Sequence, residues 1–468
     1  MVTDSRVTLK RLSEDYLANG KVPIAFDFKK EFLAMNVNTI NDSRQFHYLH
    51  YYPGKIYPYI PLFLLSLEDL KHLNGYVLDA FAGSGTVLLE SIINPIIRRR
   101  ALGVDINPLA RLIAKVKVTP LNLEQIDSSL ASIKQAYSKK INFQDSIPNF
   151  KRIDIWFSES AKKSLARLRY AIDKLDAPAD YRDFFWVCFS SIIRKSSRAD
   201  PFIPPPVLLK AYKYGKSSSK YAKVTSFLET AENPDTWGLF EDAVRKNKVK
   251  LGAIRKSISN DCRCEIIWDD VANIKKGKLT ERGRIEKDGA EAILPGSIDI
   301  IFTSPPYLTA QKYIRASKLE LYWLGYSEEE VNDLDKSSLG TERVSKKSVI
   351  GKLDVKPIDS LVSYAYKKNP KRGLTVYAYF NRMKKILNQL YPLLKNGGYA
   401  FFVVGDNRVL NKKVDTYLML SEIAQSIGFK EKAILKDTIK TRSMMTKRNG
   451  TGGLITHEYV VILKKGME

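Results

Sequence analysis

The stretch DIIFTSPPYLT, Asp299–Thr309, decides the fold class of this chain. A run of branched apolar residues stops at Ser304, and two prolines and an aromatic residue follow. A short segment that is apolar throughout is typical of a parallel strand buried on both faces, so we predict such a strand over 298–304. Proline fixes φ and lacks an N–H donor. The strand should therefore end in a rigid corner whose carbonyl oxygens are free acceptors.

Two further segments are predicted to be buried strands of the same sheet. YVLDAF (76–81) is followed by a glycine turn, and YAFFVVGDN (399–407) follows NGG. Before the second of these, apolar residues at helical spacing predict a helix over 374–395, which the glycine pair would end. Strand and helix thus alternate along the chain, as they do in α/β proteins.

The last segments predict how the sheet closes. LMLSEIAQSIGF (418–429) has helical spacing and reaches a glycine, whereas KAILKDTIK (432–440) and EYVVILKK (458–465) alternate apolar and polar residues. Alternation of this kind indicates antiparallel strands. We therefore predict an α/β fold, a Rossmann-like sheet with helices on both faces and a closing antiparallel hairpin.

Two long stretches interrupt this pattern. Residues 121–260 carry mainly amphipathic helix signal followed by a turn-rich basic segment, and residues 333–375 are polar and basic without a clear period. We predict that the first is a mainly helical, basic insertion and that the second is a basic insertion. The predicted division is completed by an N-terminal segment over 1–75 and by three parts of the core over 76–120, 261–332 and 376–468.

Charge is the most informative bulk property. The 468 residues are enough for one large core with insertions or for two domains. The 76 Lys and Arg against 51 Asp and Glu leave a formal net charge of +25. A surplus of this size favours binding to a polyanion through counterion release, which makes nucleic acid the first partner to consider. A basic surface that serves only solubility is the alternative, and charge alone does not decide between the two.

Hydropathy and cysteine content predict a cytoplasmic protein. No apolar run reaches membrane-spanning length, and the first residues, MVTDSRVTLKRLSEDYL, lack the apolar core of a secretory signal. The three cysteines, Cys188, Cys262 and Cys264, cannot form a disulfide framework and lack zinc-finger partners. We expect reduced thiols and no metal site.

A glycine turn follows the strand predicted over 76–81. Gly83 and Gly85 would let the backbone approach a ligand, and the helix behind them offers unpaired N–H groups. Asp105, at the end of a second short strand, can accept hydrogen bonds from both hydroxyls of a ribose. The dinucleotide fingerprint fits poorly because Leu88 stands at the third glycine position, and no Gly-Lys-Ser/Thr follows for a phosphate-binding loop. A nucleoside cofactor without a pyrophosphate fits better, and a tight turn without a ligand is the alternative.

The Ser-Pro-Pro-Tyr corner suits a substrate that presents N–H donors on a flat ring, such as the exocyclic amine of a nucleobase. The Ser304 hydroxyl and the Pro305 carbonyl would accept the two amine protons and direct the nitrogen lone pair toward an electrophile, while Tyr307 would stack on the ring. The alternative is an edge strand that simply ends in proline.

Two motifs together resemble a known family. SPPY at Ser304–Tyr307 and DAFAGSGT at Asp79–Thr86 are similar to motifs of the amino-group DNA methyltransferases, which use S-adenosylmethionine to methylate N4 of cytosine or N6 of adenine. In that family SPPY occurs mostly in N4-cytosine enzymes. The resemblance implies a class I methyltransferase sheet and covers the predicted strands, Asp105 and the closing hairpin, but neither insertion.

The resemblance also implies roles for residues of this chain. The catalytic corner would consist of Ser304, Pro305, Pro306 and Tyr307. The methionine end of the cofactor would be lined by Asp79, Phe81, Gly83, Gly85 and Thr86. Its ribose would be held by Asp105, its adenine amine by Asp270 or Asp269, with Asp270 favoured, and its flank by the Tyr-Pro-x-Lys segment through Tyr52 and Pro53. His47 and His50 stand three residues apart, but no further zinc ligands are found, so we expect surface or structural histidines.

DNA contacts are expected in two basic segments. One is SSIIRKSSRAD, with Arg194, Lys195 and Arg198 near a predicted helix end, and the other is the hairpin loop TRSMMTKRNGTGG, with Arg442, Lys447 and Arg448. A solvated basic face and a plain flexible turn are the respective alternatives.

The function predicted from these motifs is transfer of a methyl group from S-adenosylmethionine to cytosine N4 in double-stranded DNA, with the target base flipped into the corner. The alternatives are N6-adenine as the target, RNA as the substrate, a non-catalytic nucleic-acid-binding subunit on the same fold, and a dinucleotide oxidoreductase. A cognate restriction endonuclease or a specificity subunit would be a natural partner.

Overall fold

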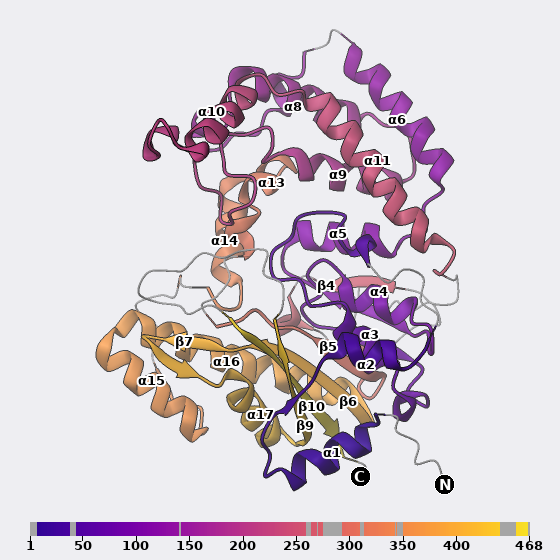
Figure 1. Ribbon diagram of the computed structural model, residues 1–468, viewed down its shortest axis with the longest axis vertical. Helices are drawn as coiled ribbons and strands as arrows, with labels where there is room; N and C mark the ends of the chain where they lie inside the picture. Colours follow the sequence, from indigo (N-terminus) through magenta and orange to yellow (C-terminus); the bar gives the residue numbers. More distant parts are fainter. Residues whose placement is uncertain are drawn as a thin grey trace.

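An eight-stranded sheet lies in the lower half of the molecule in Figure 1. The computed structural model describes residues 7–37, 44–139, 142–258, 264–268, 270–274, 293–308, 313–341, 343, 350–439 and 455–466. The strand order is β1-β9-β10-β6-β5-β2-β3-β4. The strands span Ile24–Ala25 (β1), Tyr76–Asp79 (β2), Arg100–Val104 (β3), Cys264–Trp268 (β4), Ile298–Thr303 (β5), Leu394–Gly405 (β6), Phe429–Thr438 (β9) and His457–Lys465 (β10).

The sheet is parallel from β4 through β6 and closes with an antiparallel hairpin. Strand β10 lies between β6 and β9 and is antiparallel to both. This arrangement confirms the predicted Rossmann-like sheet. Strand β2 has β3 on one side and β5 on the other, so the order along the sheet reverses at β2. In parallel α/β sheets a crevice for ligands opens at the carboxyl ends of the strands at such a point.

The apolar run Ile298–Thr303, which forms β5, is buried along its whole length. Ile298, Ile300, Ile301 and Phe302 are all inaccessible to solvent on β5. Burial of one such side chain stabilises a fold by roughly 1.5–3 kcal/mol, which explains why this strand is apolar on both faces. The Ser-Pro-Pro-Tyr corner therefore follows a strand that is buried along its whole length.

Helices cover both faces of the sheet, as Figure 1 shows. One group gathers beside β2 and β3 and spans Tyr59–Leu65 (α3), Thr86–Ile92 (α4) and Pro108–Val118 (α5). The other group lies against β6, β9 and β10 and spans Lys356–Lys368 (α15), Pro370–Leu393 (α16) and Thr416–Ile427 (α17). Near the N-terminus, Leu9–Ala18 (α1) precedes β1 and Phe28–Ala34 (α2) follows it.

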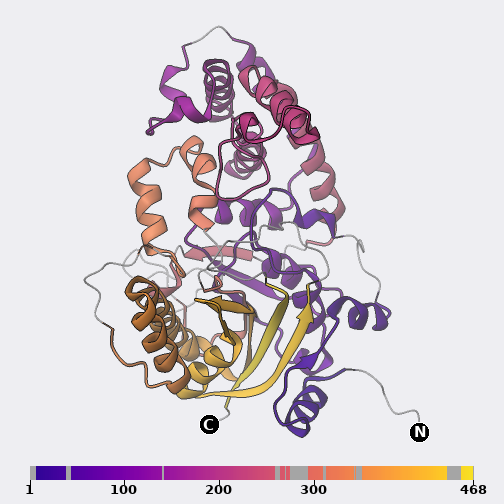
Figure 2. The same ribbon diagram turned by 60° about the vertical axis from the view of Figure 1, so that its left-hand side comes forward.

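A second body of helices lies beyond α5, and its helical character was predicted for 121–260 (Figure 1). Its helices span Leu123–Ser138 (α6), Ile153–Trp156 (α7), Glu159–Asp173 (α8), Ala179–Ile192 (α9), Ser219–Glu232 (α10) and Thr236–Arg255 (α11). Three further helices follow the corner and span Tyr313–Ala316 (α12), Lys318–Trp323 (α13) and Glu328–Ser337 (α14). Figure 2 shows this trio between the sheet and the helical body.

The trio belongs to the helical body by its packing. The Trp323 ring lies edge-on to Phe157 and Phe189, with ring centroids 5.5 and 6.3 Å apart. All three rings are buried in one apolar cluster. The predicted boundary at residue 332 therefore falls inside α14, a helix that packs with the insertion. The strand signals in 261–332 do not indicate that the chain after the corner packs against the helical body.

Two local predictions were wrong. Residues 333–375 were predicted to lack a period, but they contain α15, whose buried Ile358, Leu361, Val362 and Ala365 follow helical spacing. The helix before β6 was predicted to stop at the glycine pair, but it ends at Leu393 and the strand begins at the next residue. The glycines lie within β6 at a register shift against β5. A short hairpin, Asn407–Val409 (β7) with Lys412–Val414 (β8), was also not predicted.

Within the described residues no helix is long and apolar enough to cross a membrane. Cys188 and Cys264 are both free thiols, and Cys262 lies outside the described residues.

Candidate active site

A cavity opens at the carboxyl ends of β2, β3 and β5, where the sheet topology predicts a ligand site. Its empty space, together with the part open to solvent, is about 680 Å³. Its wall is formed by Tyr52, Gly54, Ala80, Phe81, Gly83, Val104, Asp105, Ile106, Asn107, Asp270, Val271, Ser304, Pro306, Tyr313, Ile314, Ser337, Ser338, Leu339, Arg382 and Ile386. Residues predicted from the glycine turn, the Asp105 strand and the Ser-Pro-Pro-Tyr corner thus share one cavity.

The glycine turn is fixed by Asp105. The Gly83 N–H donates to Oδ2 of Asp105 at 2.7 Å, and the Asn107 N–H donates to Oδ1 at 2.8 Å. Gly83 has φ of +49° and Gly85 has φ of +74°, which side chains disfavour. A Cβ at Gly85 would also lie 2.8 Å from the Cβ of Ala114, so this glycine permits close packing of α5. The Asp105 carboxylate keeps lone pairs for further donors, although burial raises its pKa.

Asp79 joins the ends of β2 and β5. Its Oδ1 accepts from the Thr303 hydroxyl at 2.7 Å and from the Phe81 N–H at 3.2 Å. Burial raises the pKa of Asp79 to about 7. Asp79 and Thr86 are both buried and neither borders the cavity. Asp79 holds the start of the glycine turn through the Phe81 N–H. Direct contact of Asp79 or Thr86 with a cofactor stays a prediction.

Asp270 lies on the opposite wall with a partner that the sequence did not suggest. Arg382 of α16 donates from Nη2 to Oδ2 of Asp270 at 2.8 Å, and the Ala272 N–H donates to Oδ1 at 3.0 Å. A second guanidinium nitrogen of Arg382 donates to the carbonyl of Ser337. Arg382 therefore ties the Asp270 turn to the end of α14. Asp269 lies outside the described residues.

The Tyr-Pro-x-Lys segment forms another part of the wall. The Tyr52 hydroxyl accepts from Nδ2 of Asn107 at 3.3 Å, and the same amide nitrogen donates to the Ser317 hydroxyl at 3.1 Å. A Cβ at Gly54 would lie 2.8 Å from the Tyr313 ring, so the glycine allows that ring to pack on the backbone. Pro53 does not border the cavity. Asn107 and Tyr313 were missed because no motif marks them.

The corner itself is held by β6 and β10. The Ser304 hydroxyl donates to the Val403 carbonyl at 3.0 Å, and the Tyr307 hydroxyl donates to Oε1 of Glu458 at 3.0 Å. A Cβ at Gly405 would lie 2.6 Å from the Tyr307 ring, so the ring packs directly on the β6 backbone. Ser304 and Pro306 border the cavity, whereas Pro305 is buried and Tyr307 does not reach the wall. Glu458 is a residue that the sequence did not indicate.

Glu458 predicts a pH dependence of stability. Burial raises its pKa from 4.5 to about 7, so its contribution to stability is complete below pH 4.5 and is lost as the pH rises through 7. We expect Glu458→Gln, whose side chain stays neutral, to gain stability relative to wild type between pH 5 and 8, by on the order of 2 kcal/mol. Urea unfolding across this range measures the difference. Asp79 and Glu90 titrate in both proteins and cancel, and a constant difference would contradict the prediction.

The two histidines are structural. Nε2 of His47 lies 2.7 Å from Oε1 of Glu90, and Arg44 donates to both oxygens of Glu90 at 2.8 and 3.0 Å. Glu90 belongs to α4, all three side chains are buried, and burial lowers the pKa of His47. His50 is buried as well and contacts the Tyr51 carbonyl at 2.8 Å. Among the described residues no group of three or more His, Cys, Asp or Glu is arranged to hold a metal ion.

The prediction that Arg194 contacts phosphates is wrong. Arg194 is 5% exposed, and its Nε lies 3.3 Å from Oε1 of the buried Glu320. Arg198 pairs with Glu232 through two contacts of 2.7 and 2.8 Å and keeps a quarter of its side chain exposed. Lys195 is exposed. A run of basic residues at a helix end does not indicate which of the side chains is buried. Arg442, Lys447 and Arg448 lie outside the described residues.

The Arg194–Glu320 pair predicts a stability effect. Replacing Arg194 by Met leaves the Glu320 carboxylate buried without its cation, so we expect a loss of roughly 3–5 kcal/mol at pH 8. The free energy of urea unfolding measures it. Arg194→Met combined with Glu320→Gln removes both charges and should recover part of the loss. Equal losses in the single and double variants would show that the pair is not the cause.

The fold and cavity together define a class of protein. A sheet in this order, with a glycine turn, an acid after the next strand and a Ser-Pro-Pro-Tyr corner on one cavity, has the architecture of a class I methyltransferase. Residues 298–468 match the family model described as DNA methylase. Residues 298–468 therefore carry the domain of the amino-group DNA methyltransferases, and the protein is an enzyme that uses S-adenosylmethionine as its methyl donor. This identification favours an enzyme over the non-catalytic subunit and over the oxidoreductase.

Curated relatives agree with the family over most of the chain. "Type II methyltransferase M.MvaI" of Kocuria varians is 24% identical over 462 residues, which cover 91% of this chain and 95% of the relative. "Type II methyltransferase M.BsoBI" of Geobacillus stearothermophilus is 24% identical over 393 residues, covering 76% of this chain and 73% of the relative. M.AvaI of a Nostoc species is 24% identical over 408 residues, covering 81% and 77%.

Solved structures overlay only loosely. A SAM-dependent methyltransferase from Methanosarcina mazei covers 89% of this chain and all of its own, with a TM-score of 0.29 and 9% identity. The rRNA methyltransferase aviRa from Streptomyces viridochromogenes covers 89% of this chain and 88% of its own, with a TM-score of 0.26 and 12% identity. The fold assignment therefore rests on the strand order and not on these overlays.

Proposed function

We propose that the protein is a site-specific methyltransferase that acts on cytosine N4 in duplex DNA in the cytoplasm, with the target base flipped out of the helix. The observation that carries the proposal is the hydrogen bond made by the Ser304 hydroxyl. This hydroxyl donates a hydrogen bond to the Val403 carbonyl and borders the cavity, so its oxygen is available to accept a hydrogen bond from a substrate amine. Extrusion of the base costs a few kcal/mol.

The cavity fits the donor by its chemistry. Apolar surface from Phe81, Val104 and Ile106 suits the flat faces of an adenosine, and the Asp105 carboxylate suits its ribose hydroxyls. Asp270, oriented by Arg382, would accept from the adenine amine. Gly83 brings the backbone to the wall, and Tyr52 would cover the flank. When bound, S-adenosylmethionine supplies a methyl group activated by a positively charged sulfur.

The chain's contribution at the corner is alignment. Ser304 and the Pro305 carbonyl would hold both protons of the amine, which directs the nitrogen lone pair into the cavity. Tyr307 would stack on the base, and its hydrogen bond to Glu458 limits the orientations of the ring. These neutral acceptors serve any exocyclic amine, so N6 of adenine is the second candidate target.

Target recognition is proposed for the helical body. It borders the cavity through Ile314 of α12 and Ser337 of α14, and its exposed Lys195 suits a phosphate. Partly paired Arg198 and the hairpin loop with Arg442, Lys447 and Arg448 would add contacts. A cognate restriction endonuclease or specificity subunit is the protein partner we propose, because the relatives carry Type II names.

The test is methyl transfer to mixed-sequence duplex DNA, followed by digestion to nucleosides and mass spectrometry. N4-methylcytosine supports the proposal, and N6-methyladenine replaces it with the second candidate. Transfer to RNA but not to DNA would overturn both. Mapping the modified positions then supplies the target sequence.

A further inference from the structure

The segment 200–207, DPFIPPPV, is an exposed apolar loop on the helical body, and we call it the proline loop. Phe202 is 70% exposed, Val207 47% and Ile203 37%. Single exposed apolar residues are common, but three within eight residues form a patch that usually meets a partner. The proposed function leaves this loop without a role.

The loop is held rigidly although its side chains are exposed. The Asp200 N–H donates to the Val207 carbonyl at 2.8 Å, which closes the base of the loop. Oδ1 of Asp200 accepts from the Phe202 N–H at 2.8 Å and from the Ile203 N–H at 3.1 Å. Four prolines restrict φ further. Phe202 is therefore presented on a fixed backbone, and little conformational entropy remains to be lost when it binds.

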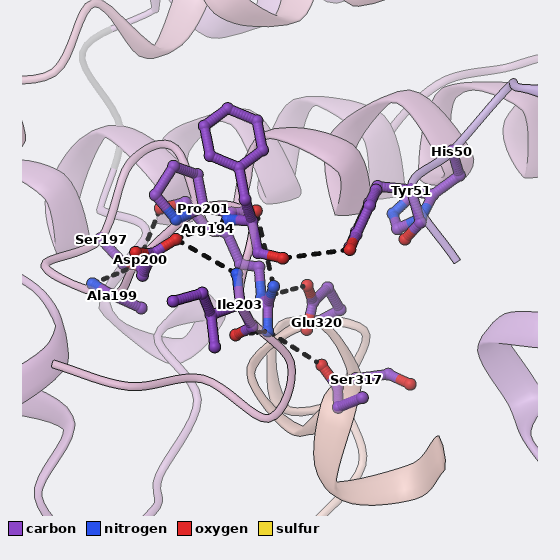
Figure 3. Close-up of polar contacts among 12 residues, drawn as sticks. His50, Tyr51, Arg194, Ser197, Ala199, Asp200, Pro201, Ile203, Ser317 and Glu320 are labelled. Atoms are coloured by element: carbon purple, nitrogen blue, oxygen red, sulfur yellow. Dashed lines mark hydrogen bonds and ion pairs between the residues drawn. The ribbon is translucent and has the colours of Figure 1, made fainter. Parts of the chain in front are cut away.

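Two side chains connect the loop to segments next to residues of the active-site wall, and Figure 3 shows their polar contacts. Nη2 of Arg194 donates to the Ile203 carbonyl at 3.2 Å and to the Ala316 carbonyl at 3.4 Å. The Tyr51 hydroxyl donates to the Phe202 carbonyl at 3.0 Å. Because Tyr52 and Ile314 line the cavity, the loop is attached within two residues of its wall on both sides. The backbone of Phe202 and Ile203 is thus tied to segments that adjoin the cavity wall.

The surroundings of the loop are strongly basic. From 195 to 223 the chain has seven Lys or Arg and one acid, Asp200, which is occupied within the loop. The lysines in this range are all exposed: Lys195, Lys210, Lys213, Lys216, Lys220 and Lys223. Such a rim repels a second copy of the same surface and attracts a polyanion.

We propose that Phe202, supported by Ile203, is a wedge that enters the base stack of duplex DNA next to the target and fills the space left by the flipped base. Apolar side chains inserted between base pairs unstack DNA, and phosphates on either side would meet the basic rim. The proposal rests on the proposed function and adds the residue that keeps the gap open. Arg194 and Tyr51 act as positioning residues, because they fix the loop and do not touch the DNA.

The test compares wild type with Phe202→Ala on two duplexes. The first carries the mapped target, and the second carries an abasic site opposite the target base, which makes that base easier to extrude. We expect the variant to transfer methyl at least tenfold more slowly to the paired duplex in single turnover, but within threefold of wild type to the abasic duplex. Fluorescence of 2-aminopurine at the target position should rise less with the variant on the paired duplex.

The control is Tyr212→Ala, another exposed aromatic residue of the same body, at 75% exposure and outside the loop. It should match wild type on both duplexes. Equal slowing of Phe202→Ala on both duplexes, or no slowing on either, overturns the wedge, as does a change of its mass in ultracentrifugation that marks the loop as a self-association surface. Absence of any transfer by wild type refutes the proposed function instead. Since Phe202 is mostly exposed, the variant should fold, which thermal unfolding checks.

Discussion

Ser304→Ala should transfer methyl about 100-fold more slowly than wild type while its affinity for S-adenosylmethionine changes less than about threefold. The Ser304 hydroxyl is committed as a donor to Val403, so the change removes an acceptor for the substrate amine and leaves the cofactor side of the cavity intact. Single-turnover transfer gives the rate, and isothermal titration with the cofactor gives the affinity. A variant at full rate would reject the proposed role of this oxygen.

The matched control for this experiment is Ser338→Ala. Ser338 lines the same cavity, but its hydroxyl donates to the Leu334 carbonyl at 2.7 Å at the end of α14, away from the corner. We expect a rate within threefold of wild type. If both variants transfer methyl equally slowly, loss of any serine from the cavity lowers the rate. The specific role proposed for Ser304 would then be rejected.

Asp105→Asn should weaken cofactor binding about 100-fold, which corresponds to about 2.7 kcal/mol. The carboxylate already accepts the Gly83 and Asn107 N–H groups, and its remaining lone pairs would accept the ribose hydroxyls. The amide of Asn offers one oxygen and turns an NH₂ group toward donors, so at least two of these bonds are lost. Titration with the cofactor measures the change, and the turnover should recover at saturating cofactor.

Asp299→Asn is the control for Asp105. Asp299 is 6% exposed and accepts the Tyr76 N–H at 3.0 Å, but it belongs to the opposite end of the strands. We expect it to lower stability and leave cofactor affinity unchanged. If Asp105→Asn binds the cofactor as wild type does, the ribose assignment is wrong. If both variants lose affinity, loss of folded protein is the cause.

The parts of the fold that the sequence predicted are those with local signals. Strand β5 was predictable because burial on both faces demands an apolar run, and α17 because Gly428 ends it with a positive φ. The helix α15 was missed although Ile358, Leu361 and Val362 have helical spacing, because its lysines made the segment look like a basic loop. The spacing was the better guide than the composition.

The candidate site divides in the same way. Ser304, Gly83 and Asp105 stand in motifs that the sequence shows, and all three line the cavity. Arg382 and Glu458 were not, since Arg382 is 112 residues from Asp270 and Glu458 is 151 residues from Tyr307. Contacts over such separations depend on the packing of the sheet and leave no local pattern. Arg194 was misassigned for the same reason, because its partner Glu320 lies after the corner.

The position of β10 has a consequence for biosynthesis. This strand is made after every other described strand, yet it lies inside the sheet between β6 and β9. Until β10 has been synthesised, the edges of β6 and β9 that it will occupy are unpaired. Unpaired strand edges are sites at which unfinished chains aggregate. Glu458, the residue that anchors Tyr307, arrives with the same strand. A nascent chain therefore lacks the partner that orients Tyr307 until β10 has been made, and a chaperone that shields the open edges would have most effect before that point.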